Sequence, residues 1–180
     1  MDSVERHGQR GGGRDSRPAR VIVGVDGSLG SLGALRQAVA EARQRGAELC
    51  AARVVREDHP WIGLVPLGEE DMETLRGQTE TAFQDALGGV PADLRVRCVL
   101  LTGEPGPALV DFACREEDLL VVGASWQAGL RRWWHRPVSG YCVRHAHCPV
   151  LTVPLSELAR TLVRTRRSRW EADLDQLLDA

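Results

Sequence analysis

Residues 119–154 read LLVVGASWQAGLRRWWHRPVSGYCVRHAHCPVLTVP, and this stretch decides the fold. It opens with an uninterrupted apolar run that ends at Gly123, and it closes with a second apolar run, 149–153. Both runs are short and rich in β-branched residues, as strands buried on both faces of a parallel sheet are. Residues 138–146 lie between them and are long enough for a crossover helix. The stretch therefore predicts a β-loop-α-β unit.

Three further strands and three helices are predicted upstream of this unit. The strands are 20–25, 49–55 and 95–101, and the helices are 31–45, 69–87 and 107–115. Apolar residues recur at helical spacing in the first helix, where Gly46 suits the C-terminal end, and Gly88 and Gly89 stop the second. Five strands alternating with helices predict an α/β fold, an open, doubly wound, five-stranded parallel sheet with right-handed crossovers.

Length and composition bound the class of protein. The chain has 180 residues, enough for one α/β domain with a substantial core. No segment approaches transmembrane length, and the first twenty residues lack the apolar region of a signal peptide. We therefore expect a cytoplasmic protein that does not bind membranes. The net charge of -2 gives no overall attraction to nucleic acid, and the absence of lysine excludes Schiff-base chemistry and a P-loop.

The predicted domain, residues 19–154, is flanked by two segments of different character. Residues 1–18 are rich in arginine and glycine with few apolar side chains, which predicts a disordered arm. Acidic residues dilute its charge, so we expect no nucleic-acid role. Residues 155–180 are predicted to form an amphipathic helix capped by Ser156. Its apolar side must be covered by this domain, a second subunit or another protein; acids interrupting its basic face argue against a membrane surface.

The cysteines and histidines do not predict a metal centre or a catalytic pair. The five cysteines form no CxxC pair and mostly lie in apolar segments, which predicts reduced core thiols. His145 and His147 are two residues apart at a helix end, and no second compact ligand pair occurs elsewhere. A catalytic cysteine needs an exposed, activated thiolate beside a base, which nothing in the spacing requires. We expect no metal and no enzymatic activity.

Four segments of the chain resemble the motifs of the universal stress protein family, in the family's order and spacing. They are VIVGVDGS at 21–28, TGEP at 102–105, LVVG at 120–123 and RHAHCPV at 144–150. The resemblance covers roughly residues 20–153. It implies strand order 3-2-1-4-5, the adenine nucleotide alpha hydrolase-like fold, and a homodimer joined through the last strand, here Val150–Val153.

The family divides into members that bind ATP and members that do not. In the ATP-binding members, the loop after the fourth strand follows GxxGx(9)G(S/T), and its N–H groups and hydroxyl hold the phosphates. Gly123 matches the first glycine, but Trp126 replaces the second, and Arg136 and Pro137 replace the last two positions. A tryptophan fills the space near the phosphates, and a proline has no N–H to donate. We therefore expect conventional ATP binding to be lost.

The other half of the family's nucleotide site matches. The resemblance implies that Asp26 faces the ribose and that the backbone at Val54 meets adenine, and Ser139 fits the pattern after the motif. From the residues alone, Asp26 can also cap its own loop, which we favour, and Ser139 can satisfy an N–H group at a helix start. In the alternative, ATP with Mg²⁺ binds and Arg136 replaces the lost phosphate donors.

The segment 131–136, RRWWHR, is unusual for a loop. We favour the hypothesis that Trp126, Trp133 and Trp134 collapse into the vacated cleft. A protein partner is the second interpretation, since tryptophan and arginine are enriched at interface hot spots. Stacking on single-stranded nucleic acid is the third. The sequence as a whole predicts a non-catalytic binding or regulatory protein of the stress response without a cofactor; a nucleotide-dependent regulator is the alternative.

Overall fold

The structure is a computed structural model, and it describes residues 18–56, 69–124, 137–157 and 159–161. Several residues singled out from the sequence lie outside these ranges, together with the arm and most of the C-terminal segment. These residues are Trp126, Trp133, Trp134 and Arg136.

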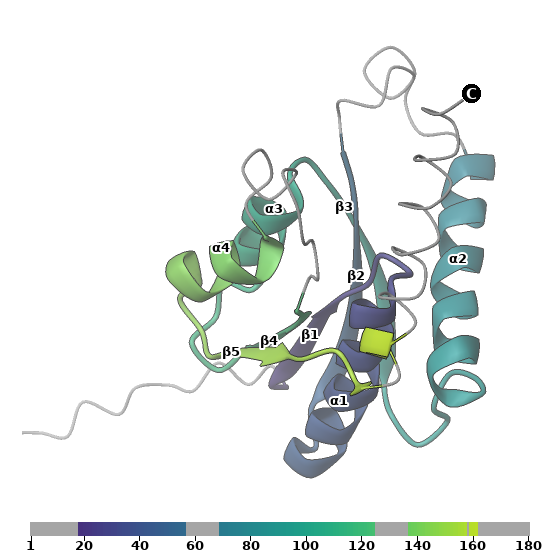
Figure 1. Cartoon of the computed structure of the whole chain (residues 1–180), viewed down its shortest axis with the longest axis horizontal. Coiled ribbons are helices and arrows are strands. Elements are labelled where there is room, and N and C mark those ends of the chain that lie inside the picture. Colours follow the sequence, from purple (N-terminus) through teal and green to yellow (C-terminus); the bar gives the residue numbers. More distant parts are fainter. Residues whose placement is uncertain (1–17, 57–68, 125–136, 158, 162–180) are drawn as a thin grey trace, which may run out of the picture.

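The sheet has five parallel strands in the order β3-β2-β1-β4-β5, which confirms the predicted topology (Figure 1). Its strands are β1 (Arg20–Gly24), β2 (Glu48–Val55), β3 (Val96–Thr102), β4 (Leu119–Gly123) and β5 (Val150–Val153). Strands β2 and β3 lie on one side of β1, and β4 and β5 lie on the other, so the strand order reverses between β1 and β4. Loops from these two strands therefore diverge at the carboxyl edge, where sheets of this kind bind ligands.

Four helices cover the two faces of the sheet, so the doubly wound arrangement is confirmed (Figure 1). They are α1 (Leu29–Arg45), α2 (Glu69–Leu87), α3 (Pro105–Phe112) and α4 (Val138–His145). Helices α1 and α2 cover one face, and α3 and α4 cover the other. The predicted start of α3 at residue 107 is wrong, because Pro105 already occupies the first turn, where its fixed φ suits a helix.

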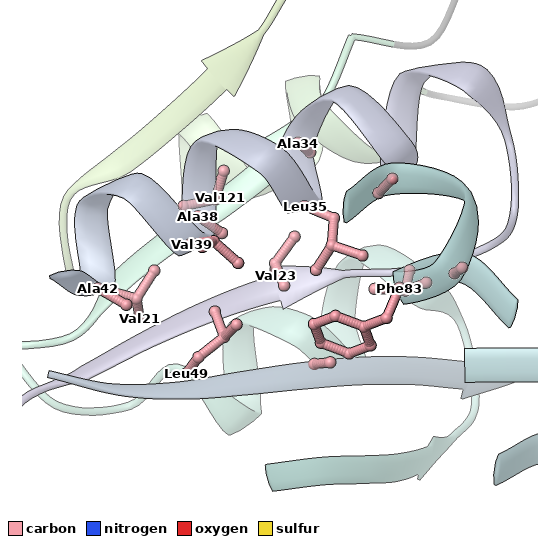
Figure 2. Close-up of a cluster of buried hydrophobic side chains, with 14 of the residues drawn as sticks. Val21, Val23, Ala34, Leu35, Ala38, Val39, Ala42, Leu49, Phe83 and Val121 are labelled. Atoms are coloured by element: carbon pink, nitrogen blue, oxygen red, sulfur yellow. The ribbon is translucent and has the colours of Figure 1, made fainter. Parts of the chain in front are cut away.

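The larger core lies between the sheet and helices α1 and α2 (Figure 2). Val21 and Val23 of β1 point into it, and Phe83 of α2 is fully buried beside them. Ile22, between the two valines, faces the second core under α3 and α4. Strand β1 is thus buried on both faces, as is β4, whose apolar run 119–122 lacks the polar alternation of a half-exposed strand.

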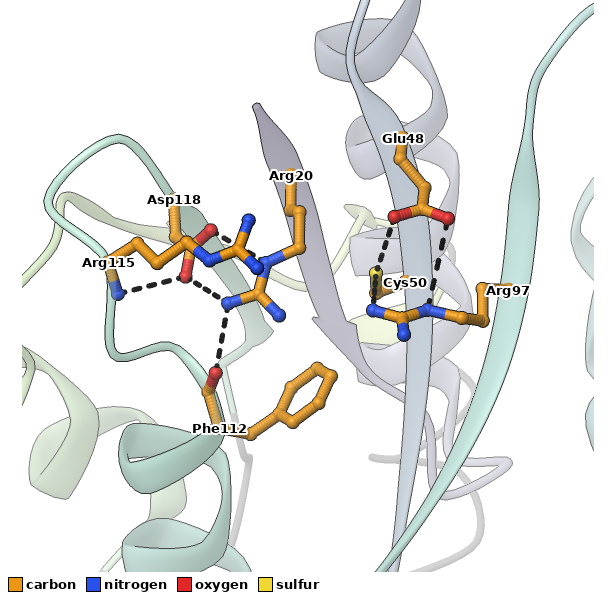
Figure 3. Close-up of polar contacts among 7 residues, drawn as sticks. All are labelled: Arg20, Glu48, Cys50, Arg97, Phe112, Arg115 and Asp118. Carbon is orange, nitrogen blue, oxygen red and sulfur yellow. Dashed lines mark hydrogen bonds and ion pairs between the residues drawn. The ribbon is translucent and has the colours of Figure 1, made fainter. Parts of the chain in front are cut away.

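The amino ends of β1 and β4 are joined by a buried ion pair (Figure 3). The Arg20 guanidinium donates to both carboxylate oxygens of Asp118, at 2.9 and 2.6 Å, and to the carbonyl of Phe112 at 3.2 Å. Asp118 also accepts from the backbone N–H of Arg115 at 3.1 Å. Both charges therefore have the partners that burial demands. The pair aligns the two strands whose opposite ends carry the candidate site.

Polar side chains also join α1 to the end of α2 and to the following loop. Arg36 Nε donates to the carbonyl of Ala86 at 2.7 Å, which satisfies an oxygen left over at the helix end. Arg43 forms a two-point ion pair with Asp93, at 2.7 and 2.9 Å. Gly46 is the C-terminal cap of α1, with φ of 60°, as the sequence predicts.

The chain after β5 begins the predicted C-terminal helix. Ser156 Oγ accepts from the N–H of Ala159 at 3.2 Å, so Ser156 caps this turn as predicted. Leu155 and Ala159 are buried, and Leu155 lies close to the first turn of α1. None of the helices in the described ranges is long and apolar enough to cross a membrane.

Candidate functional site at the carboxyl edge of the sheet

The loop after β1 is fixed by its own polar groups. Asp26 Oδ1 accepts from the N–H of Ser28 at 2.9 Å, and Ser28 Oγ accepts from the N–H of Ser31 at 3.2 Å. Between them Gly27 has φ of 80°, a conformation that a side chain disfavours. Ser28 is the N-cap of α1. The loop-capping interpretation of Asp26 is therefore confirmed.

Asp26 is an anion at neutral pH. Desolvation by the surrounding protein tends to raise the pKa of its carboxyl, but hydrogen bonds from Ser28 and Ser31 together outweigh that effect and hold the pKa below its ordinary value. The residue is exposed to solvent. A carboxylate with a lowered pKa is a hydrogen-bond acceptor for a hydroxyl or an N–H group, and it is a poor general acid or base near pH 7.

Gly123 is in close backbone contact with the first turn of α1. A Cβ atom at position 123 would overlap the carbonyl of Gly30 and lie 3.0 Å from the nitrogen of Ser31. A Cβ at Gly30 would in turn lie 3.1 Å from the carbonyl oxygen of Ala124. Both glycines are therefore required by the packing of α1 on the end of β4. The glycine that matches the family's phosphate motif has a structural role independent of any phosphate.

The N-terminus of α4 offers few donors to a ligand. Pro137 is its N-cap, with φ of -60° and ψ of 132°, and no side chain caps the helix. Proline has no N–H, so one of the usual helix-start donors is missing. Ser139, half-buried in the first turn, forms no hydrogen bond to a described residue. Its predicted capping role is therefore wrong.

Val54 lies near the carboxyl end of β2, beside β1. Its side chain is half-buried and packs against the core under α3 and α4. Just beyond it, Arg56 Nη2 donates to Glu104 Oε1 at 2.8 Å, and the N–H of Gly103 donates to the carbonyl of Val55 at 2.9 Å. Sequence reasoning missed the Arg56–Glu104 pair, since 48 residues separate its members and no local pattern joins them.

The topology thus places Asp26, Val54 and Gly123 at one edge, at the ends of the adjacent strands β1, β2 and β4. Pro137 and Ser139 follow at the start of α4. The role of each toward a nucleotide stays a prediction. Arg136 and Trp126 belong to the stretch outside the described residues.

The thiols and imidazoles of the described residues do not converge. No group of three or more histidine, cysteine or acidic side chains in the described ranges could hold a metal ion. Cys50, Cys142 and Cys148 are buried, as predicted for core thiols, whereas Cys98 and Cys114 are exposed. Burial raises the pKa of Cys142 to about 11, which leaves its thiol protonated and unreactive at neutral pH.

The fold defines the class of protein. A parallel five-stranded sheet of order 3-2-1-4-5, with loops diverging between its first and fourth strands, is the adenine nucleotide alpha hydrolase-like α/β fold. The model of the "Universal stress protein family" matches residues 19–154, and the chain belongs to this family.

Comparison with individual proteins agrees with this assignment. The chain is 30% identical over 138 residues to universal stress protein MJ0531 of Methanocaldococcus jannaschii, covering 74% of this chain and 81% of that protein. It is 32% identical over 139 residues to universal stress protein Rv2005c of Mycobacterium tuberculosis, covering 74% of this chain but 47% of the other. The chain thus spans about half the length of this mycobacterial relative.

A solved structure of a universal stress protein in complex with cAMP is also similar. It has 28% sequence identity and a TM-score of 0.54, and the match covers 78% of this chain and 100% of that one. The similarity therefore extends over that relative's whole chain.

Proposed function

We propose that this chain is a non-catalytic binding and regulatory protein of the stress response that lacks the conventional ATP site of its family. The observation that carries the proposal is Pro137 at the N-cap of α4, where no side chain caps the helix and the residue itself has no N–H. By family resemblance, this position holds the hydroxyl residue that contacts phosphate in ATP-binding members.

The energetic consequence is large. A hydrogen bond to a charged group contributes about 1.5 to 3 kcal/mol. Losing the hydroxyl and the N–H would therefore weaken ATP binding by roughly a hundred-fold to ten-thousand-fold. The substitutions Trp126 and Arg136 depart from the motif in the same loop, and Gly123, which matches it, is explained by its contact with Gly30.

We propose that the protein is not an enzyme because of the residues at the carboxyl edge of its sheet. Asp26 lies in the loop after β1, and its pKa is lowered away from neutrality. Its Oδ1 atom is already bonded to Ser28. Ser28 and Ser31 hydrogen-bond to each other and not to any described histidine, so no described base activates either as a nucleophile.

A nucleotide-dependent regulator is the second candidate, and the cAMP complex of the 28% identical relative favours it. In this hypothesis the ribose would contact Asp26, adenine would contact the backbone at Val54, and Arg136 would attract the phosphate. A ligand with a single phosphate needs fewer donors than ATP, so the loss at Pro137 would affect it less. Mg²⁺ would accompany ATP only.

Calorimetric titration of the full-length protein separates these candidates. The ligands are ATP with Mg²⁺, AMP and cAMP, and the comparison protein carries Trp126→Gly, Arg136→Gly and Pro137→Ser together. The first proposal expects no ATP binding by the native protein and measurable binding by the variant. Micromolar ATP binding by the native protein would refute it. Binding of cAMP or AMP without ATP would establish the second candidate in its single-phosphate form.

The proposal includes a homodimer joined through β5. The strand is at the edge of the sheet, and Val150, Leu151 and Val153 are only half-buried there. A pairing of two such edges would cover these side chains and use the unpaired backbone groups. Light scattering of the native protein and of Thr152→Pro, which removes one edge N–H, tests this assembly; a monomeric native protein contradicts it. A partner at Trp133, Trp134 or the C-terminal helix, and a cytoplasmic location, stay predictions.

A further inference from the structure

One side of α4 carries a hollow of about 210 Å³ that shares only Pro137 with the candidate site. It is lined by Pro137, Gly140, Tyr141, Arg144 and His145, a spacing of three and four residues that places all five on one side of the helix. Gly140 stands in the middle of this row. Because it has no side chain, the row is interrupted, and the hollow lies over the helix backbone. We call it the α4 notch.

One wall of the notch is held in place by its neighbours. A Cβ atom at Gly106 of α3 would lie 2.9 Å from the ring of Tyr141, so this ring packs directly on the α3 backbone. The Tyr141 ring also contacts His145, and the centroids of the two rings are 4.2 Å apart. Helices α3 and α4 lie side by side on this face of the sheet (Figure 1). Tyr141 is therefore a rigid apolar surface rather than a mobile side chain.

One end of the notch carries a positive charge that has no partner among the described residues. Arg144 is exposed and forms no hydrogen bond or ion pair with any described residue. His145 is exposed beside it. By contrast, Arg20, Arg36 and Arg43 each bond to a carboxylate or a carbonyl. A guanidinium without a partner at the edge of an apolar hollow matches a carboxylate, which it can bind through two parallel hydrogen bonds.

The size of the notch indicates what it can hold. Pockets for cofactors and drug-sized ligands measure about 300 to 1,000 Å³, so the notch suits one amino-acid side chain better. We propose that it binds a glutamate side chain of an acidic peptide segment in a partner protein. The methylene groups would lie between Pro137 and Tyr141, and the carboxylate would bind Arg144. Charge and shape alone favour the glutamate side chain, and its binding requires no nucleotide at the carboxyl edge.

The test is an NMR titration of the ¹⁵N-labelled full-length protein with a blocked peptide of six glutamates, with a six-glutamine peptide as the control ligand. We expect the glutamate peptide alone to shift the amides of Gly140, Tyr141, Arg144 and His145. Arg144→Gln should weaken binding about fivefold, as for loss of one exposed charge pair. The matched control Arg95→Gln removes an exposed charge at the start of β3 and should leave the affinity unchanged.

A second variant, Gly140→Ala, separates a loss of the notch from a loss of folding. The added Cβ would lie 3.4 Å from Pro137 Cγ, a distance that the helix tolerates. The methyl group would fill the space above residue 140 in the notch. We expect weaker peptide binding together with a higher melting temperature, since alanine favours a helix more than glycine does. The proposal would be overturned if both peptides caused equal amide shifts. It would also be overturned if Arg95→Gln reduced the affinity for the glutamate peptide as much as Arg144→Gln does. Notch shifts caused only by inorganic phosphate or by a single-stranded oligonucleotide would overturn it as well.

Discussion

The backbone of Gly30, in the first turn of α1, lies against Gly123 at the end of β4, so closely that a Cβ on Gly123 would overlap the Gly30 carbonyl. A methyl group cannot be accommodated there by rotating a side chain, because the obstacle is backbone. The contact joins the start of α1 to the end of β4.

We therefore expect Gly123→Ala to destabilise the protein by about 1 to 3 kcal/mol, as overpacking does. The measurement is urea unfolding followed by circular dichroism. Gly33→Ala is the matched control: it lies in α1, where a Cβ would meet only Val153 at 4.0 Å, and it should stabilise the fold by about 0.5 to 1 kcal/mol. An unchanged midpoint for Gly123→Ala would contradict the packing explanation of this glycine.

The Arg20–Asp118 pair gives a second prediction. Asp118→Ala leaves a guanidinium that is 7% exposed without its partner, which costs about 3 to 5 kcal/mol in buried pairs. Asp93→Ala, which breaks the exposed pair with Arg43, serves as the control and should have little effect. The measurement is the unfolding midpoint of each variant. Similar midpoints would mean that the buried pair contributes no more to stability than the exposed pair does.

The lowered pKa of Asp26 predicts a pH dependence of stability. Its folded pKa lies below the unfolded value of about 3.9, so the carboxylate stabilises the fold above that pH, and this contribution is lost as pH falls through the folded pKa. The difference in unfolding free energy between the native protein and Asp26→Ala should be constant from pH 5 to 7 and shrink below about pH 4. A difference that instead grows in acid would reverse the assigned direction.

The five thiols should divide by accessibility. Cys98 and Cys114 are exposed and should be alkylated by iodoacetamide in the native protein, whereas Cys50, Cys142 and Cys148 should react only after unfolding. Mass spectrometry of peptides from the native and the denatured protein makes the comparison. Rapid native labelling of Cys142, whose pKa is raised to about 11 by burial, would show that the core under α4 opens easily.

Much of the fold could be predicted from local sequence, because the central strands β1 and β4 are buried on both faces and are continuous apolar runs. The boundaries of α2 agree with the prediction, since Gly88 and Gly89 mark its end. The Arg20–Asp118 pair could not be predicted, because 98 residues separate two charges that have no local pattern. The edge strand β3 was predicted one residue early, at 95–101 instead of Val96–Thr102, although the carbonyl of Arg95 accepts a hydrogen bond from the N–H of Leu49 at 2.9 Å.

The candidate site, like the fold, could be predicted from the sequence only in part. The capping role of Asp26 follows from a short acceptor two residues before a helix, and the structure confirms it. The requirement for glycine at position 123 depends on how closely α1 approaches β4, which only the folded backbone reveals. The α4 notch was likewise missed, since a glycine within a helix gives no sign in the sequence of whether a hollow lies above it.

The Arg20–Asp118 pair joins the amino ends of β1 and β4 at the edge opposite the candidate site, and the ladder between the two strands begins beside it. These contacts involve none of the residues 125–137. We therefore expect that a loop transplanted from an ATP-binding relative in place of residues 125–137 would leave the ion pair and the β1–β4 ladder in place. Replacing this one segment would then change the ligand specificity of the protein, while the sequence of the rest of the chain stays the same.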